Sequence, residues 1–179
     1  MSSTNELFQA GDLLDDLRRD IGSSEFGYRI QGLFAHVLIC KGGKIIDIKP
    51  QGHPDIAAEL GKRKLLLQVK AVHAKISRQG FTISPEDLQG IKPINKDETG
   101  YLAILECAAP VSWTLLDYSR MARQKLKPLN MVALRAMADA PLSAECTEEF
   151  VRIIIRNRGR LRDLGFHILC CRALKGEPL

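Results

Sequence analysis

The sequence predicts an α/β protein with short strands in the middle of the chain and helices toward both ends. Apolar residues recur with the period of an amphipathic helix over residues 5–21 and 25–40. Between residues 44 and 118, apolar residues instead form short runs separated by turn-forming residues, which is typical of strands. The length of 179 residues fits one domain with an ordinary core.

Two helices are expected at the N-terminal end. Residues 5–21 place leucine and isoleucine on one face, and Gly22 ends this helix because glycine tolerates the backbone conformation that follows a helix. The second helix is expected over residues 25–40, with Ser23 or Ser24 as its N-cap. Its apolar stripe predicts one buried face.

A strand over residues 44–49 and a turn-rich connector over residues 50–54 are expected next. Two apolar runs then flank a basic turn and predict a β-hairpin. A two-residue loop at 61–62, or one residue further on, would place Asp55 directly across from Gln68 or from Lys70. Facing residues, and residues two apart, share a face of the sheet, so these three side chains would project together. A slip of one residue would send Asp55 to the other face.

A capped helix and two more strands are expected after a basic loop at residues 74–80. The segment Ser84-Pro85-Glu86-Asp87 is typical of a helix start, because serine caps the helix and proline suits its first position. The nearly continuous apolar run at residues 101–107 predicts a buried strand, and residues 112–118 predict a further one.

The last third of the chain is expected to be basic and largely helical. Helices are expected near residues 129–137 and over residues 147–164, and residues 166–171 are interpreted as a strand or packed tail. The second of these helices carries five arginines, which could contact phosphates or form a solvated face. Pro141 is a plausible boundary. The predicted organisation is an N-terminal helix (1–22), a core (23–120) and a basic helical extension packed on that core (121–179).

Charge is distributed unevenly along the chain. The net charge is +5 and the pI is about 9.0. Residues 41–80 hold nine Lys and Arg against three acidic residues, whereas residues 1–30 hold six acidic residues against three Arg. A basic centre suggests a polyanionic partner, and a solvated basic surface is the alternative.

The five cysteines form no CxxC pair, which favours reduced, structural cysteines in a cytoplasmic protein. The N-terminal segment is acidic and lacks the apolar stretch of a signal peptide. No apolar run approaches the roughly 18–20 residues that a membrane span needs. We therefore expect no membrane partner.

Asp55, Gln68 and Lys70 together have the chemistry for hydrolysing a phosphodiester. Mg²⁺ prefers oxygen ligands, which the Asp55 carboxylate, the Gln68 amide and the backbone carbonyl of residue 69 could supply. Lys70 could orient or deprotonate water, or stabilise negative charge. Glu25 could add a carboxylate, although an acidic residue in the first turn of a helix is also favoured by the helix dipole alone.

The segment His53-Pro54-Asp55, with Asp55 thirteen positions before Gln68-Val69-Lys70, resembles the PD-(D/E)xK nuclease superfamily. The expected order helix–strand–strand–strand–helix–strand is similar to that superfamily's core over about residues 23–120, and the later elements resemble archaeal Holliday-junction resolvases. The resemblance implies a restriction-endonuclease-like core and a Mg²⁺- or Mn²⁺-dependent DNA endonuclease. Gln68 departs from the Asp or Glu of most members, as in Mrr-type enzymes. Its missing charge would need another acid, such as Glu25 or Glu59.

We therefore expect a DNA endonuclease of structure-selective or relaxed sequence preference, and the resolvase likeness implies a homodimer. A non-catalytic nucleic-acid-binding module, or a subunit of a larger complex, on the same fold is the alternative. His53 is interpreted as a turn residue and Glu59 as a solvent-facing strand residue, and Asp47 ranks lower as a ligand. The residues expected to contact the DNA backbone are Lys62, Arg63, Lys64, Lys75 and Arg78.

Overall fold

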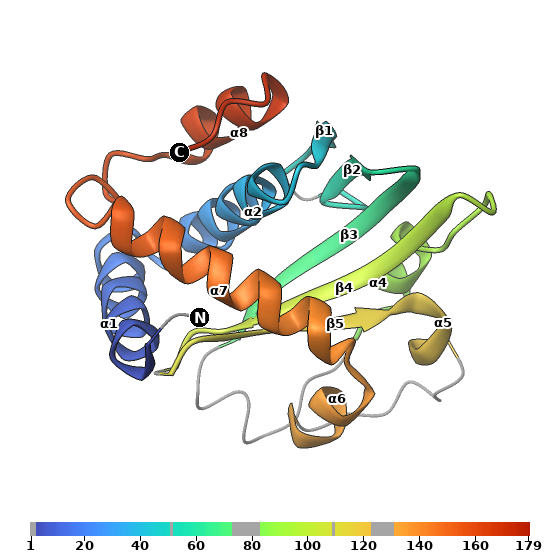
Figure 1. Cartoon of the computed structure of the whole chain (residues 1–179), viewed down its shortest axis with the longest axis horizontal. Helices are drawn as coiled ribbons and strands as arrows, with labels where there is room; N and C mark the ends of the chain where they lie inside the picture. Colours follow the sequence, from blue (N-terminus) through green and yellow to red (C-terminus); the bar gives the residue numbers. More distant parts are fainter. Residues whose placement is uncertain (1–2, 51, 73–82, 109, 123–130) are drawn as a thin grey trace.

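Five strands form one mixed sheet in the order β1-β2-β3-β4-β5, with helices on both faces (Figure 1). The computed structural model describes residues 3–50, 52–72, 83–108, 110–122 and 131–179. The strands are β1 (Lys44–Ile48), β2 (Ile56–Leu60), β3 (Arg63–Val72), β4 (Glu98–Glu106) and β5 (Ser112–Asp117). The helices are α1 (Thr4–Ile21), α2 (Ser23–Cys40), α4 (Pro85–Gly90), α5 (Tyr118–Met121), α6 (Met131–Met137), α7 (Ala140–Arg156) and α8 (Phe166–Leu174).

The two N-terminal helices follow each other with a single residue between them. A capping box starts α1, in which the Ser3 hydroxyl accepts the amide of Glu6 and the Glu6 carboxylate accepts the amide of Ser3. Gly22, with a φ of +81°, ends α1 as predicted. The expected N-cap of α2 was wrong, because Ser23 already belongs to the helix and Gly22 takes the cap position without a side chain to offer.

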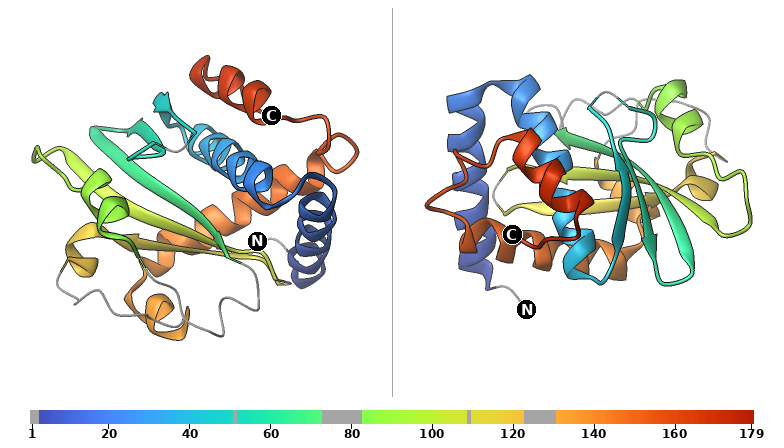
Figure 2. Two further views of the ribbon diagram at one scale, coloured as in Figure 1. Left: turned by 180° about the vertical axis from the view of Figure 1, so that it is seen from behind. Right: turned by 90° about the horizontal axis from the view of Figure 1, so that it is seen from above.

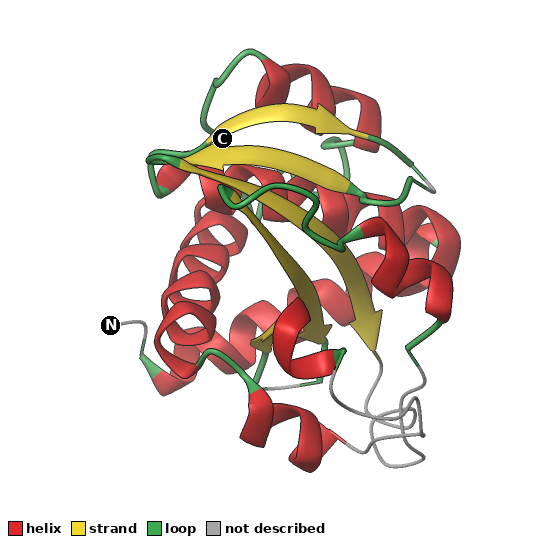
Figure 3. Cartoon of the chain, turned by 90° about the vertical axis from the view of Figure 1, so that its right-hand side faces the viewer, coloured by secondary structure: helices red, strands yellow, loops and turns green. Residues whose placement is uncertain are grey.

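The sheet combines antiparallel and parallel pairs. β1 and β2, β2 and β3, and β4 and β5 pair antiparallel, whereas β3 and β4 run parallel and are connected through α4. A parallel pair needs such a crossover because its two strands start at the same edge of the sheet. From α2 to β4, the elements follow the expected order helix–strand–strand–strand–helix–strand. Successive strands are rotated against each other, as in other twisted sheets (Figure 3).

The turn between β2 and β3 fixes the register of the hairpin. Leu60 faces Arg63, which leaves Gly61 and Lys62 as a two-residue loop, and Ile56 faces Leu67. Gly61 has a φ of +62°, a conformation that a tight hairpin turn requires and that glycine adopts without strain. This is the first of the two registers that the sequence allowed.

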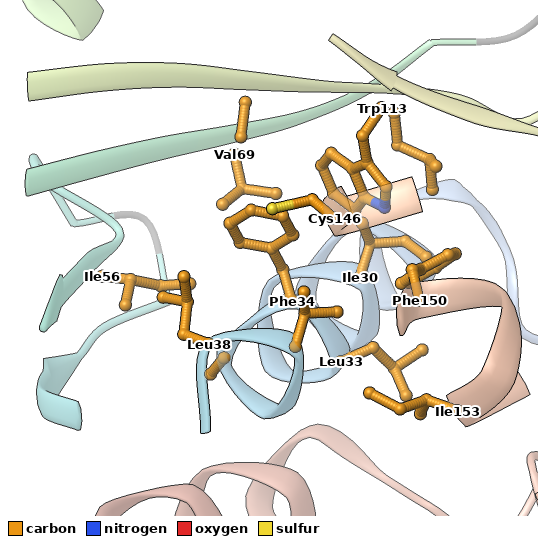
Figure 4. Packing of buried hydrophobic residues seen from close by; sticks show 14 of the residues in the cluster. Ile30, Leu33, Phe34, Leu38, Ile56, Val69, Trp113, Cys146, Phe150 and Ile153 are labelled. Atoms are coloured by element: carbon orange, nitrogen blue, oxygen red, sulfur yellow. The ribbon is translucent and has the colours of Figure 1, made fainter. Parts of the chain in front are cut away.

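The larger hydrophobic core lies between the sheet and helices α1, α2, α7 and α8 (Figure 2). Phe34 of α2, Trp113 of β5 and Phe150 of α7 meet at its centre, with Val69 of β3 pointing toward Phe34 (Figure 4). The Trp113 ring centroid lies 4.3 Å from that of Phe34 and 5.3 Å from that of Phe150. The helices at both ends of the chain therefore share one core with the sheet.

A smaller apolar cluster covers the opposite face, between the sheet and the elements α4, α5 and α6. Leu66, Leu102 and Leu116 contribute from the strands. Met131 and Leu134 of α6 cover them from outside. The apolar layer on this face is thus smaller than the one on the opposite face, and it covers the side of β3 that carries Leu66, Gln68 and Lys70.

The C-terminal helices differ from the predicted boundaries. α7 begins seven residues earlier than expected, at Ala140, because Asp139 accepts the amide of Leu142 and caps the helix, and it ends at Arg156. Pro141 therefore lies in the first turn of α7. None of the described helices is long and apolar enough to cross a membrane.

The strand considered for residues 166–171 was wrong, because Phe166–Leu174 forms helix α8. Leu169 and Ala173, four positions apart, are its buried residues. α8 packs on α2 at Gly32, where a Cβ atom would come within 2.7 Å of the Leu169 Cβ. The position of α8 therefore depends on its contact with α2, which cannot be predicted from a short apolar run in the sequence.

Gly100 of β4 offers a direct test of this packing. A Cβ atom there would overlap the carbonyl oxygen of Ile91, which follows α4. Gly100→Ala is expected to lower the free energy of unfolding by about 2 kcal/mol or more, since the obstacle is backbone. Gly27→Ala in α2, whose Cβ would meet nothing within 4 Å, should instead be neutral or stabilise by about 1 kcal/mol. Urea unfolding measures both, and a Gly100→Ala protein of wild-type stability would contradict the placement of Ile91 against β4.

Candidate functional site

The hairpin brings Asp55, Gln68 and Lys70 onto one face of the sheet. Ile56 pairs with Leu67, so Asp55 immediately before β2 lies across from Gln68, and Lys70 follows two positions later on β3. Leu66 of the same strand packs in the apolar cluster beneath α4, and residues two apart share its direction. The predicted trio is therefore assembled, and it faces α4.

Two hydrogen bonds hold the Asp55 carboxylate. Its Oδ2 atom accepts the Gln68 side-chain amide at 2.7 Å and the Val69 backbone amide at 2.8 Å. Val69 lies beyond the last residue that pairs with β2, so a side chain serves here as partner for a strand amide. Asp55 is only 1% exposed. Its position is thus set by the end of the β2–β3 pairing.

Burial raises the pKa of the Asp55 carboxyl to about 6. The hydrogen bond from Val69 and the positive charge of Lys70 lower this pKa, but they do not offset the desolvation, and the nearby Asp87 raises the pKa further. A carboxylate that is costly to ionise gains most from a neighbouring cation. Such perturbed acids are concentrated at functional sites.

Asp87 is a site residue that the sequence interpretation treated only as part of a helix start. Its Oδ1 atom lies 2.8 Å from the Lys70 ammonium, and its side chain is buried. Ser84 caps α4 by accepting the amide of Asp87 at 3.1 Å, which fixes the first turn of the helix. The expected order of strands and helices could have identified Asp87. A helix that connects two parallel strands starts near the end of the first strand, where Lys70 lies.

His53, which was interpreted as a turn residue, lies in the bend before β2 and beside this group. Its Nδ1 atom is 3.4 Å from the side-chain oxygen (Oε1) of Gln68 and 3.9 Å from the Asp87 carboxylate. Gly90 at the end of α4 lies behind it, and a Cβ atom there would come within 2.6 Å of the His53 Cβ. Asp55, Gln68, Lys70 and Asp87 are called the Asp55 cluster below, with His53 as its neighbour.

Glu25 is not brought into the Asp55 cluster. Its carboxylate accepts the Arg29 side chain at 3.0 Å, and Arg29 also donates to the backbone carbonyls of Leu161 and Arg162. The cause is helical phase, since two positions turn the helix by about 200°. Gly27 lines a hollow beside β3, so Glu25, two positions earlier on α2, faces the C-terminal segment instead.

The other candidate acids also lie elsewhere. Glu59 is exposed near the far end of β2, where it faces Lys44 and Lys64. Asp47 forms an ion pair with Lys49 at 2.8 Å. Neither carboxylate can replace the charge that Gln68 lacks, because Glu59 lies beside Lys44 and Lys64 and Asp47 is paired with Lys49.

Of the five residues expected to contact DNA, the structure describes Lys62, Arg63 and Lys64. Lys62 and Arg63 are exposed at the tip of the hairpin. Lys64 forms an ion pair with Glu98 at 3.0 Å, and backbone amides of Ile94 and Asn95 together with Lys64 lower the pKa of Glu98 to about 2. Lys64 therefore has a partner within the chain. Lys75 and Arg78 lie outside the described residues.

The Asp55 cluster offers oxygen ligands of the kind that Mg²⁺ and Mn²⁺ prefer. They are the carboxylates of Asp55 and Asp87, the Gln68 side-chain oxygen and the Val69 backbone carbonyl. In the described part of the chain, no three His, Cys, Asp or Glu side chains converge as a metal-binding group. A cation here would therefore rely on amide and backbone oxygens as well as carboxylates. The donor set fits a hard divalent ion and does not fit a zinc site of cysteine and histidine.

Two hollows flank the Asp55 cluster. One, of about 750 Å³, lies beside His53 and α4. The other, of about 380 Å³, lies between α2 and the end of β3 and includes Val69 and Lys70 in its wall. The first hollow thus reaches His53, the neighbour of the cluster, and the second reaches Val69 and Lys70 at the strand end.

Comparison with protein-family models, with curated proteins and with solved structures gave no match to this chain. The case for a function therefore rests on the geometry of the Asp55 cluster.

Replacing Asp55 by asparagine should stabilise the metal-free protein at neutral pH. The raised pKa of Asp55 means that its contribution to stability is fully present below pH 3.8 and is lost as the pH rises through about 6. Asparagine carries no such charge. In EDTA, the stability of Asp55→Asn relative to wild type should therefore increase between pH 4 and pH 7, by on the order of 1–3 kcal/mol.

Thermal unfolding at several pH values measures this difference. Asp47→Asn, which removes a partly exposed acid paired with Lys49, is the matched control and should show little pH-dependent gain. A difference between Asp55→Asn and wild type that stayed constant from pH 4 to pH 7 would contradict the burial of an ionised Asp55.

Proposed function

We propose that this chain is a Mg²⁺- or Mn²⁺-dependent DNA endonuclease with a restriction-endonuclease-like core. The observation that carries the proposal is the Asp55 cluster, in which Asp55, Gln68 and Lys70 meet where β3 extends past β2. The order of elements from α2 to β4 supports it, since it is the order implied by the resemblance to the PD-(D/E)xK superfamily.

Asp87 supplies the charge that Gln68 lacks. A member of the superfamily with an acid at position 68 would carry two carboxylates and a lysine, and the Asp55 cluster carries the same charges with Asp87 as the second acid. Gln68 keeps a positioning role, because its amide donates to Asp55 at 2.7 Å. Asp87 thus takes the role considered for Glu25 or Glu59.

The residues then have distinct roles. Asp55, Gln68 and the Val69 carbonyl would hold the divalent ion, and Asp87 would add charge from α4. A bound divalent ion supplies an acidified water molecule and polarises a phosphoryl oxygen. Lys70, whose ammonium is held 2.8 Å from Asp87, orients water or stabilises charge on the phosphate.

The hairpin tip can reach the same DNA. From Asp55 to the turn at Gly61-Lys62, the strand advances roughly 20 Å, which is about the length of six base pairs. Lys62 and Arg63 are exposed at that distance and would contact phosphates outside the cleavage point. Such contacts position a duplex without reading its bases, in keeping with structure-selective or relaxed cleavage by a monomer or a homodimer.

A non-catalytic nucleic-acid-binding module is the second candidate. One observation favours it, because the Gln68 amide satisfies Asp55 and the Lys70 ammonium satisfies Asp87 without any ion. A cluster that is closed in this way could also be a stable remnant of a catalytic site. Cleavage separates the two candidates.

The test is a cleavage panel with linear duplex, single-stranded, flap and four-way-junction DNA in Mg²⁺ or Mn²⁺. Asp55→Ala and Lys70→Ala are each expected to lower the cleavage rate by about 100-fold or more, since both act at the reacting phosphate. Asp87→Asn should raise the metal concentration needed for half-maximal activity by about tenfold. Glu25→Gln and Glu59→Gln are the matched controls and should cleave at nearly wild-type rates.

Two outcomes would overturn the proposal. Cleavage at wild-type rates by both Asp55→Ala and Lys70→Ala would remove the Asp55 cluster as the catalytic site. DNA binding without cleavage in either metal would establish the non-catalytic module.

A further inference from the structure

A recess beside the Asp55 cluster has the lining of an anion site. This recess, of about 380 Å³, lies between the N-terminal end of α2 and the last residues of β3. The polar residues in its wall are Arg18, Ser23, Ser24, Tyr28, Gln31 and Lys70, although the Lys70 side chain extends to the opposite face of the sheet, toward Asp87. We call it the α2 recess. Among these residues, Arg18 is the cationic side chain on this side of the sheet, and the described residues that line the recess include no acidic side chain.

The N-terminal end of α2 opens onto the α2 recess without a side-chain cap. Gly22 holds the N-cap position and has no side chain to accept the first amides of this 18-residue helix. Those amides and the positive end of the helix dipole favour an anion. The hydroxyls of Ser23 and Ser24 add further donors at the same place.

Unpartnered polar groups in the same wall independently indicate a ligand. Gln31 is 8% exposed, and its Oε1 atom has no hydrogen-bond partner among the described residues. The Nε atom of Arg18 is likewise buried without a partner, although Nη2 donates to Asp15. A buried polar group without a partner destabilises a protein by about 1–3 kcal/mol. A half-turn of the Gln31 amide exchanges its oxygen and nitrogen, so it can present a donor as well.

We propose that the α2 recess binds a phosphate group of a nucleic-acid strand, adjoining the phosphate that reacts at the Asp55 cluster. Arginine, hydroxyl and helix amides are the donors that phosphate oxygens accept best. Val69 and Lys70 belong to both the recess and the site. The placement next to the scissile phosphate rests on the proposed function, whereas phosphate binding by the recess does not.

Titration of the metal-free, full-length protein with inorganic phosphate tests the binding site directly. Saturable shifts are expected in the NMR signals of the Ser23 and Ser24 amides and of the Gln31 side-chain amide. Arg18→Gln should weaken this binding about tenfold or more, because a charge-assisted contact is lost. Arg19→Gln is the matched control, since it removes the same charge one residue away from a side chain that pairs with Asp15 and Asp16.

The outcomes are distinct. Shifts lost in Arg18→Gln and kept in Arg19→Gln support the recess, provided that thermal unfolding shows both variants to be folded. Absence of saturable shifts, or equal weakening in both variants, overturns it. Phosphate binding without any DNA cleavage would leave the recess standing and overturn the proposed function alone.

Kinetics on DNA identifies which phosphate the recess holds. If it holds a strand end, removing the 5′-phosphate of the DNA should raise KM about tenfold for wild type and leave KM of Arg18→Gln unchanged. If it holds a phosphate within the strand, Arg18→Gln should raise KM for both substrates at constant kcat. It should also reduce the salt dependence by roughly one phosphate contact. An active enzyme whose KM does not respond to Arg18→Gln would overturn the assignment.

Discussion

The two-residue turn at Gly61-Lys62 determines which side chains meet, and the candidate site depends on it. With this turn, Asp55 lies across from Gln68 on the face beneath α4. A register shifted by one residue would send Asp55 toward the larger core on the other face. In the observed register, Asp55 is buried and bonded to the Val69 amide. This turn therefore determines whether the Asp55 carboxylate lies beside Gln68 or points into the larger apolar core.

Interactions between residues close in sequence could be predicted, and those that depend on tertiary packing could not. The end of α1 at Gly22 and the start of α4 at Ser84 follow from the conformational preferences of single residues. The shared face of the trio follows from strand alternation. Helix α8 could not be predicted because its burial on α2 requires the close approach at Gly32. Asp87 was missed because only the path of the crossover between β3 and β4 places it over Lys70.

The Asp55 cluster and the α2 recess lie on either side of the same strand end, and both contain buried polar groups that lower the stability of the protein. Asp55 is buried with a raised pKa, and Gln31 and Arg18 hold buried atoms without partners. These groups lower the stability of the protein, whereas the cores on both faces of the sheet are apolar. A divalent ion at the cluster would favour the ionised form of Asp55, and a phosphate in the recess would give the Gln31 and Arg18 atoms a partner.

The central claim is that the Asp55 cluster binds a divalent ion, and paramagnetic Mn²⁺ tests it most directly. Substoichiometric Mn²⁺ should broaden the NMR signals of the Val69 amide and the Gln68 side-chain amide before others in the described part of the chain. This broadening should disappear in Asp55→Ala and persist in Glu25→Gln. Signals of Val69 and Gln68 that stay sharp, while residues near Asp47 or Glu59 broaden first, would contradict the account.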